Sequence, residues 1–189
     1  MKEVEIIIKV HKGARTLEKK LRKIAKFVGA VQVDDQYYHD PLRHTDYFRE
    51  DGRFARSFRL RNKDAKVRVT HKRDYFDAKG LWTYSDELET DIGDHKTFKK
   101  LIEALGYKKL VRLQIVKKTF LTAKYEIVLE EAKGLGTFLE VEALQVPRGT
   151  NIEKLKDEMR TFAKNLGIEG EEELLRGKAE LLYLKQKGK

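Results

Sequence analysis

The chain has 189 residues, 40% of them hydrophobic and 38% charged, and its net charge is +10. These values suit a globular protein that buries a proper core, and they exclude a disordered chain. The absence of cysteine excludes disulfides and thiolate chemistry, and no segment approaches the roughly 20 apolar residues of a membrane span. We therefore expect one cytoplasmic domain over residues 1–189, with a composition that suits a heat-adapted source.

The positive charge is unevenly placed along the chain. Residues 1–80 hold 21 Lys and Arg against 12 Asp and Glu, so this part carries +9. A basic region in such a protein indicates a polyanionic partner: a nucleic acid, an anionic surface or a phosphorylated small molecule. Charge alone does not choose among these three classes.

The first predicted element is a strand over the residues "EVEIIIKV", 3–10. Read with a period of two, Glu3, Glu5, Ile7 and Lys9 share one face, and four apolar residues share the other. An amphipathic helix and then four strands, separated by turn residues, are predicted next, over 14–28, 31–40, 54–62, 66–73 and 82–91.

The second half of the chain also mixes helices and strands. Asp94 and Asn151 are suitable N-caps for two helices, which Gly106 and Gly167 can end. Three strands are predicted between these helices, over 110–121, 124–130 and 137–146, and a last helix begins near residue 171. Eight strands with about four helices predict an α+β fold built on a closed eight-stranded antiparallel barrel.

Several predicted strands repeat charges on one face. These residues are Arg59 and Arg61, Lys66, Arg68 and Lys72, Glu87 and Glu89, Glu126 and Glu130, and Glu140 and Glu142. An ordinary barrel would turn these charges to solvent. An inverted barrel would place them in its lumen and put its apolar faces under the helices. Unpaired charges in such a lumen cost several kcal/mol each, so it would need both signs, water and a charged ligand.

Both signs of charge are present, so an inverted barrel would have a definite chemistry. Arginine and lysine bind the oxygens of a polyphosphate, and paired glutamates suit Mg²⁺ or Mn²⁺, which prefer hard oxygen ligands. The segment "QYYHDPLR" adds aromatic residues and Arg43, which would stack a base, cover the mouth of the lumen, or form a plain core strand.

The order of these motifs resembles the CYTH superfamily, the triphosphate tunnel metalloenzymes, which includes class IV adenylate cyclases, thiamine triphosphatases and inorganic tripolyphosphatases. The similar motifs are the N-terminal ExE, "YYHDPLR", RxR followed eleven residues later by Lys72, "DELET" and "IVLEEAKGLGTFLEVE", with a weaker echo in "RGKAELL". Archaeal-type class IV adenylate cyclases are the most similar branch. The resemblance implies the inverted barrel.

The resemblance also implies roles for particular residues. The positions that bind metal in the family are occupied by Glu3, Glu5, Glu130, Glu140 and Glu142. The positions that grip the triphosphate are occupied by Arg59, Arg61, Lys72 and Lys117, and the implied catalytic residues are Lys9 and Lys72. The implied cofactor is Mg²⁺ or Mn²⁺.

Several positions depart from the family pattern. The lysine of the N-terminal ExExK is replaced by Ile7, and Lys9 starts about 7 Å further along the strand. Because that lysine helps to activate water in triphosphatases of the family, hydrolysis by that route is in doubt. Thr119 breaks a later KxR pattern, and Glu130 stands where the family has a shorter aspartate.

The resemblance favours a divalent-metal-dependent enzyme that acts on triphosphates, most similar to an adenylate cyclase that converts ATP to cyclic AMP and pyrophosphate. One alternative is a triphosphatase acting on tripolyphosphate, thiamine triphosphate or a nucleoside triphosphate. Another is a tunnel that binds polyanions or RNA without catalysis. The expected partner is a triphosphate, with nucleic acid less favoured, no membrane, and a homodimer left open.

Overall fold

The computed structural model describes residues 2–168 and 173–188. Within them, nine strands form one antiparallel sheet of order β1-β6-β5-β4-β3-β7-β8-β9-β2. The strands are β1 Lys2–Glu3, β2 Glu5–Val10, β3 Lys26–His39, β4 Arg56–Lys63, β5 Lys66–Phe76, β6 Trp82–Ile92, β7 Lys108–Leu121, β8 Tyr125–Ala132 and β9 Gly136–Ala143. The helices are α1 Ala14–Ile24, α2 His44–Tyr47, α3 His95–Ala104, α4 Ile152–Asn165 and α5 Lys178–Gln186, with a 3₁₀ turn at Pro41–Arg43.

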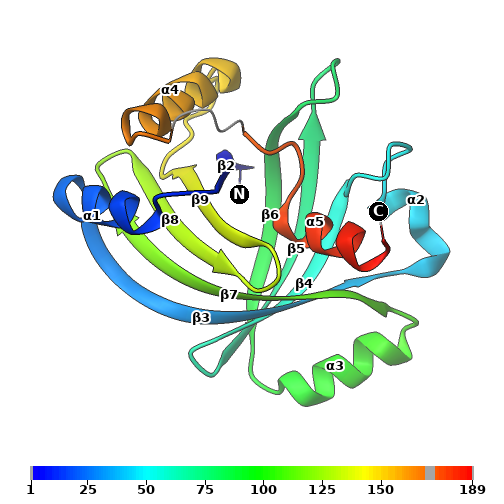
Figure 1. The fold of residues 1–189 in the computed structure, drawn as a ribbon. Helices are drawn as coiled ribbons and strands as arrows, with labels where there is room; N and C mark the ends of the chain where they lie inside the picture. Colours follow the sequence, from blue (N-terminus) through cyan, green and yellow to red (C-terminus); the bar gives the residue numbers. More distant parts are fainter. Residues whose placement is uncertain (1, 169–172, 189) are drawn as a thin grey trace.

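The N-terminal segment pairs with β9 at one edge of this sheet and, over two residues only, with β6 at the other. Lys2 and Glu3 pair with Asp86 and Ser85 of β6, whereas β2, after a break at Val4, pairs with β9. β2 follows β9 over its whole length, and the sheet curls into an open half-barrel (Figure 1). The predicted closed barrel is therefore wrong in its closure. The predicted eight strands are found when β1 and β2 are taken as parts of one.

Glu173 and Leu174, which precede α5, lie along the free side of β2. Glu173 forms a bridge with Ile8, and the backbone N–H of Leu174 donates to a carbonyl of β2 at 2.7 Å. From α4, the ammonium of Lys156 lies 2.6 Å from the Glu173 carboxylate and donates to the carbonyl of Trp82, at the start of β6, at 2.8 Å. These contacts tie the two edges of the half-barrel together from outside.

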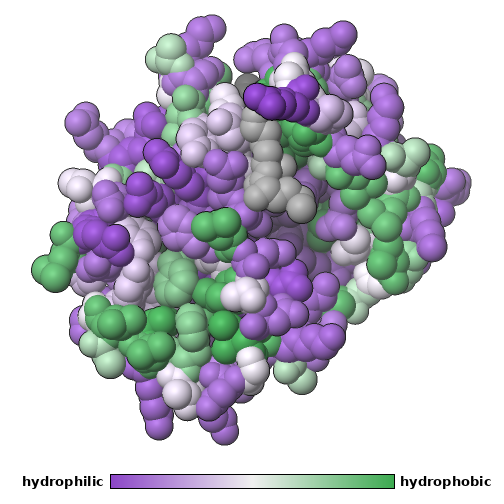
Figure 2. All heavy atoms as spheres, turned by 180° about the vertical axis from the view of Figure 1, so that it is seen from behind, coloured by the Kyte–Doolittle hydropathy of each residue, from purple (hydrophilic) through white to green (hydrophobic). Residues whose placement is uncertain are grey.

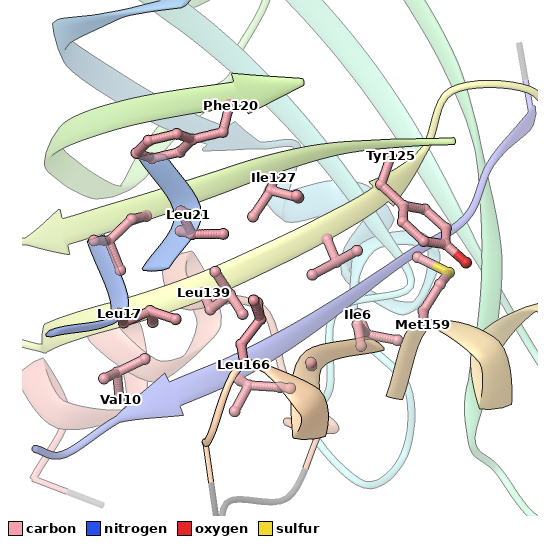
Figure 3. Packing of buried hydrophobic residues seen from close by; sticks show 14 of the residues in the cluster. Ile6, Val10, Leu17, Leu21, Phe120, Tyr125, Ile127, Leu139, Met159 and Leu166 are labelled. Carbon is pink, nitrogen blue, oxygen red and sulfur yellow. The ribbon is translucent and has the colours of Figure 1, made fainter. Parts of the chain in front are cut away.

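Apolar side chains on the outer face of β2, β8 and β9 form the main core. Ile6, Ile127 and Leu139 are fully buried there, and Leu21 of α1 and Met159 of α4 close over them (Figure 3). Full burial of each such side chain stabilises the fold by about 1.5–3 kcal/mol. The apolar residues of these strands therefore lie outside, under helices, which is the inverted arrangement and not the ordinary one.

Helix α5 departs from the predicted arrangement because it packs on the concave face (Figure 1). Ala179 and Leu182 belong to a second core with Ile7 and Phe138, which occupy inward positions of β2 and β9. These apolar residues give the helix a surface inside the half-barrel. The prediction that every helix covers the outer face is wrong for α5.

The predicted N-caps are confirmed. The Asp94 side chain accepts a hydrogen bond from the backbone of Thr97 at 3.0 Å, and the Asn151 side chain accepts one from Lys154 at 3.0 Å. The glycines predicted to end these two helices, at positions 106 and 167, have φ of +93° and +78°, which a side chain would strain.

Two helix boundaries differ from the prediction. The helix predicted over 14–28 ends at Ile24, because residues from Lys26 onward pair with β7. The last helix begins at Lys178 and not near 171; Glu171 and Glu172 lie outside the described residues. The structure also contains the short helix α2, which brings the helices of the described chain to five where about four were predicted.

The surface agrees with the highly charged composition. Seen from behind, hydrophilic residues cover most of the face, and hydrophobic residues form separate patches (Figure 2). Among the described helices, none is both long enough and apolar enough to cross a membrane.

Candidate functional site

A cavity of about 470 Å³ lies on the concave side of the sheet, and we refer to it as the lumen. Among the described residues, ten acidic and seven basic side chains line it. Side-chain alternation places them there, because the charged residues of β4, β5 and β9 occupy every second position and their apolar neighbours face outward. The structure therefore collects both signs of charge in one cavity.

One side of the lumen is the arginine wall, which we define as Arg59, Arg61 and Asp35. Asp35 on β3 is the register partner of Arg61 on β4, is fully buried, and accepts two hydrogen bonds from Arg61 at 2.8 and 2.7 Å. A nitrogen of Arg59 lies 3.8 Å from the same carboxylate. Burial would raise the pKa of Asp35, but the two arginines outweigh it and lower that pKa. The arginines are thus positioned before a ligand binds.

The opposite side is the glutamate wall, which we define as Glu3, Glu5, Glu140 and Glu142. The Lys72 ammonium reaches across from β5 and lies 2.5 Å from the Glu3 carboxylate and 3.0 Å from that of Glu5. Burial nevertheless raises the pKa of Glu5 to about 7. At Glu5, burial and the neighbouring carboxylates therefore outweigh the attraction of Lys72.

Glu142 shows this shortage of positive charge most clearly. It has no ion pair with any described residue, and its register partners are Glu5 on β2 and Glu126 on β8. Burial and the negative charges of Glu3, Glu5 and Glu140 raise the pKa of Glu142 to about 8. A cation bound beside this carboxyl group would favour its ionised form.

Two lysines share two carboxylates deeper in the lumen. The Lys117 ammonium is 2.7 Å from Glu130 and 4.0 Å from Glu140. The Lys178 ammonium, from the start of α5, is 2.6 Å from Glu130 and contacts Glu140 directly. Burial would raise the pKa of Glu140, but Lys178 and Lys117 lower it well below its usual range. The Glu130 carboxylate is fully buried and meets both lysines at ion-pair distance without well-directed hydrogen bonds.

The glutamate wall suits a divalent metal in its chemistry. Carboxylate oxygens are the ligands that Mg²⁺ and Mn²⁺ prefer, and Glu142 lies between two acidic register partners without an ion pair to any described residue. Within the part of the chain that the structure describes, no three acidic or histidine side chains converge on one point. Lys72 and Lys178 bind the carboxylates instead. The residues fit a dication, provided that an ammonium group yields its place.

Most of the predicted site residues meet in the lumen. Eight of the ten line it: Glu3, Glu5, Arg59, Arg61, Lys72, Lys117, Glu140 and Glu142. Glu130 is buried against Lys117 and Lys178 and does not line the cavity. Lys9 does not line it either, and its ammonium lies 5.9 Å from the centre of the Phe138 ring. The individual roles assigned to these residues remain predictions.

Sequence reasoning missed several charged residues of the lumen, among them Asp35 and Lys178, which form ion pairs there. Asp35 is a single acidic residue at an inward position of β3, and a single charge gives no repeated pattern to detect. Lys178 lies in "RGKAELL", in a helix that was expected on the outer face. The segment "QYYHDPLR", for which three roles were considered, is divided between the two faces of the sheet. Tyr37 lines the lumen, Tyr38 is buried in an outer core, and Arg43 is exposed and pairs with Asp40.

Comparison with known proteins supports this description. The CYTH domain model matches residues 1–177, ending just before α5. The Methanocaldococcus jannaschii protein named "Putative adenylate cyclase MJ0240" is 27% identical over 169 residues, covering 89% of this chain and 91% of that protein. The fold is similar to the PH1819 protein from Pyrococcus horikoshii OT3, with a TM-score of 0.78, 25% identity, and coverage of 97% of this chain and 99% of that one. It is also similar to HpAC1 from Hippeastrum, for which a dominant triphosphatase activity is described, with a TM-score of 0.65, 16% identity, and coverage of 100% and 96%.

Proposed function

The chain belongs to the CYTH domain family, and we propose that its lumen binds a triphosphate together with a divalent cation and catalyses cleavage of a phosphoanhydride bond of that triphosphate. One observation carries this proposal: a preformed arginine wall faces an under-neutralised glutamate wall across one cavity. The first wall suits phosphate oxygens, and the second suits a hard cation.

The charge balance of the lumen favours the two ligands together. With ten acidic against seven basic side chains, a bare polyphosphate would meet net negative charge. A metal–triphosphate complex brings a dication to the glutamate wall and phosphate oxygens to the arginine wall. We therefore expect binding of the triphosphate to depend strongly on the metal.

We assign the site residues accordingly. Arg59, Arg61, Lys72 and Lys117 would bind phosphate oxygens, and Glu3, Glu5, Glu140 and Glu142 would hold Mg²⁺ or Mn²⁺. Glu130 would support Lys117 from behind or join the metal ligands, and Lys9 would need to turn from Phe138 to act. A bound metal would neutralise phosphate charge and lower the pKa of the attacking hydroxyl group.

The reaction that we favour is cyclisation of ATP. The ribose 3′-oxygen forms a bond to the α-phosphorus, the bond from that phosphorus to the bridging oxygen breaks, and pyrophosphate leaves. The proton of the 3′-hydroxyl passes to solvent. Arg59 and Arg61 would hold the leaving pyrophosphate, whose charge rises as the bond breaks. Support comes from the name of the M. jannaschii relative and from Ile7, which leaves β2 without the lysine that water activation uses.

A triphosphatase is the second candidate. HpAC1 has the same fold and a dominant triphosphatase activity, so this architecture accommodates hydrolysis. In that reaction water attacks the γ-phosphorus and orthophosphate is released. The two reactions differ in how the substrate lies in the lumen.

The test is to incubate the protein separately with ATP, thiamine triphosphate and tripolyphosphate, in Mg²⁺ or Mn²⁺, and to resolve the products chromatographically. It is run both at room temperature and hot, because the composition suits a heat-adapted source. We expect cyclic AMP and pyrophosphate from ATP. Orthophosphate as the main product would establish the triphosphatase, and binding without turnover would leave a polyanion-binding tunnel.

A further inference from the structure

Lys178 is a buried cation that enters the lumen from α5, just beyond the residues that match the family model. Its side chain is 9% exposed, and its ammonium contacts the carboxylates of Glu130 and Glu140. Lys117 contacts the same two carboxylates from β7. Lys178 is therefore placed as close to the centre of the lumen as a residue already assigned to the triphosphate.

The sheet itself supplies little countercharge to Glu140. Its register partners are Ile7 on β2 and Val128 on β8, both of which are apolar. Lys117 remains 4.0 Å from the Glu140 carboxylate, whereas Lys178 contacts it directly. Helix α5 thus provides the cation that the position of Ile7 lacks.

We propose that Lys178 is an exchangeable cation of this site, which neutralises Glu130 and Glu140 in the empty lumen and binds a phosphate oxygen when triphosphate and metal are present. The inference rests on the proposed function and adds a residue to it. When a dication takes over the carboxylates, the ammonium of Lys178 becomes free for phosphate.

The structure makes this exchange feasible without movement of the helix. Ala179 and Leu182 anchor α5 in the inner core, while the side chain of Lys178 has a flexible four-carbon stem that can move its ammonium group. Gly177 and Lys178 form the lumen-facing N-terminal end of α5, where no side chain caps the backbone N–H groups. The positive end of the helix dipole favours phosphate at the same place.

Calorimetric titration of the full chain tests the proposal with two ligands, Mn²⁺ alone and tripolyphosphate in saturating Mn²⁺. For Lys178→Met we expect Mn²⁺ alone to bind several-fold more tightly, because a competing ammonium is gone. Tripolyphosphate should bind roughly 10- to 100-fold more weakly, because a charge-assisted hydrogen bond is lost. A purely structural role would weaken both ligands, so opposite shifts are the signature.

Three further variants guard against an effect of misfolding. Lys156→Met removes a lysine that is equally buried but pairs with Glu173 outside the lumen, so it should lower thermal stability and leave both affinities unchanged. Lys178→Arg keeps the charge and should retain most of the tripolyphosphate affinity. In the Lys178→Met background, Ile7→Lys places a new ammonium beside Glu140 and should restore part of the tripolyphosphate affinity.

The outcomes separate the two proposals. If the parent protein binds no tripolyphosphate in Mn²⁺, the proposed function fails. If the parent binds it and Lys178→Met leaves both affinities unchanged, or weakens both equally, the exchange role of Lys178 is wrong. Trp82, the single tryptophan, lines the lumen 5.4 Å from the Lys72 ammonium, so its fluorescence gives an independent signal of occupancy.

Discussion

The two walls of the lumen carry opposite charges, and they also differ in how those charges are compensated. The arginine wall contains its own counterion, since Asp35 pairs with Arg61 through two hydrogen bonds. The glutamate wall depends on lysines from β5, β7 and α5, and it still leaves Glu142 with a pKa of about 8. The arginine wall has its counterion on a neighbouring strand, whereas the glutamate wall draws its cations from β5, β7 and α5.

This difference teaches how a binding site can be built into a stable fold. A buried charge with a hydrogen-bonded partner is tolerated, and losing the partner is costly. Crowded carboxylates that lack a partner weaken the fold until a cation arrives. Removing the counterion of the arginine wall should therefore cost mainly stability, whereas removing a carboxylate of the glutamate wall should cost mainly metal binding.

The largest expected effect on stability is that of Asp35→Asn. Arg61 and Arg59 would be left buried without their carboxylate, which lowers the free energy of unfolding by about 3–5 kcal/mol. Urea denaturation measures it. The control is Asp34→Asn, whose aspartate pairs with the exposed Arg112 and should cost less than about 1 kcal/mol. Equal losses for the two variants would contradict a special role for Asp35.

Glu140→Gln should abolish turnover and weaken Mn²⁺ binding, because a neutral amide is a poor ligand for a hard dication. A relief of repulsion among carboxylates would make this variant more stable. The structure indicates the reverse, because Glu140 pairs with Lys178. We therefore expect the free energy of unfolding to fall by about 1–3 kcal/mol. Turnover assays and urea denaturation measure the two effects. Undiminished activity would place the metal elsewhere.

Arg61→Ala should weaken tripolyphosphate binding by about 1.5–3 kcal/mol, the contribution of a charge-assisted hydrogen bond. Calorimetry in saturating Mn²⁺ measures this loss. The parent protein should bind diphosphate and monophosphate progressively less well. Equal affinity for single-stranded RNA and tripolyphosphate, with a steep dependence on salt, would favour the polyanion-binding alternative.

Glu142→Gln should stabilise the protein, and by an amount that depends on pH. The folded-state pKa of about 8 lies above the ordinary 4.5, so the contribution of Glu142 to stability is greatest below pH 4.5 and is lost as pH rises toward 8. Replacing the carboxyl group removes this loss, which we place at about 1–2 kcal/mol near pH 8 after allowing for partial solvent exposure.

Metal-free unfolding curves at pH 5 and pH 8 check this expectation. The gain from Glu142→Gln should appear at pH 8 and be small at pH 5. Added Mn²⁺ should stabilise the wild-type chain more at pH 8, because metal ligands must lose their protons. A gain of the same size at both values would mean that Glu142 is not the group that titrates.

The smallest expected change follows Ile7→Lys in the parent chain. A lysine opposite Glu140 should raise tripolyphosphate hydrolysis a few-fold and affect the formation of cyclic AMP less. The gain is small because Lys178 already supplies a cation there. Release of orthophosphate measures it. Lys9→Ala is the companion variant: an unchanged rate would show that Lys9, which lies against Phe138, has no catalytic role.

Much of the fold and of the candidate site could be predicted from the sequence. The period of two in "EVEIIIKV" and "FLEVEAL" assigns Glu3, Glu5, Glu140 and Glu142 to one face of their strands, and the order of the motifs identified the family. Side-chain alternation is a local property of an extended chain, so it can be read from neighbouring residues.

The sequence did not show that the half-barrel remains open, that α5 lies inside it, or that Asp35 and Lys178 complete its charges. Each of these depends on residues far apart in the chain, such as Lys178 and Glu140, that only folding brings together. By itself the sequence determined which side chains share a face and therefore which charges can enter the lumen. The tertiary structure decided which of those charges are neutralised, because a counterion acts through its distance in space and not through its position along the chain.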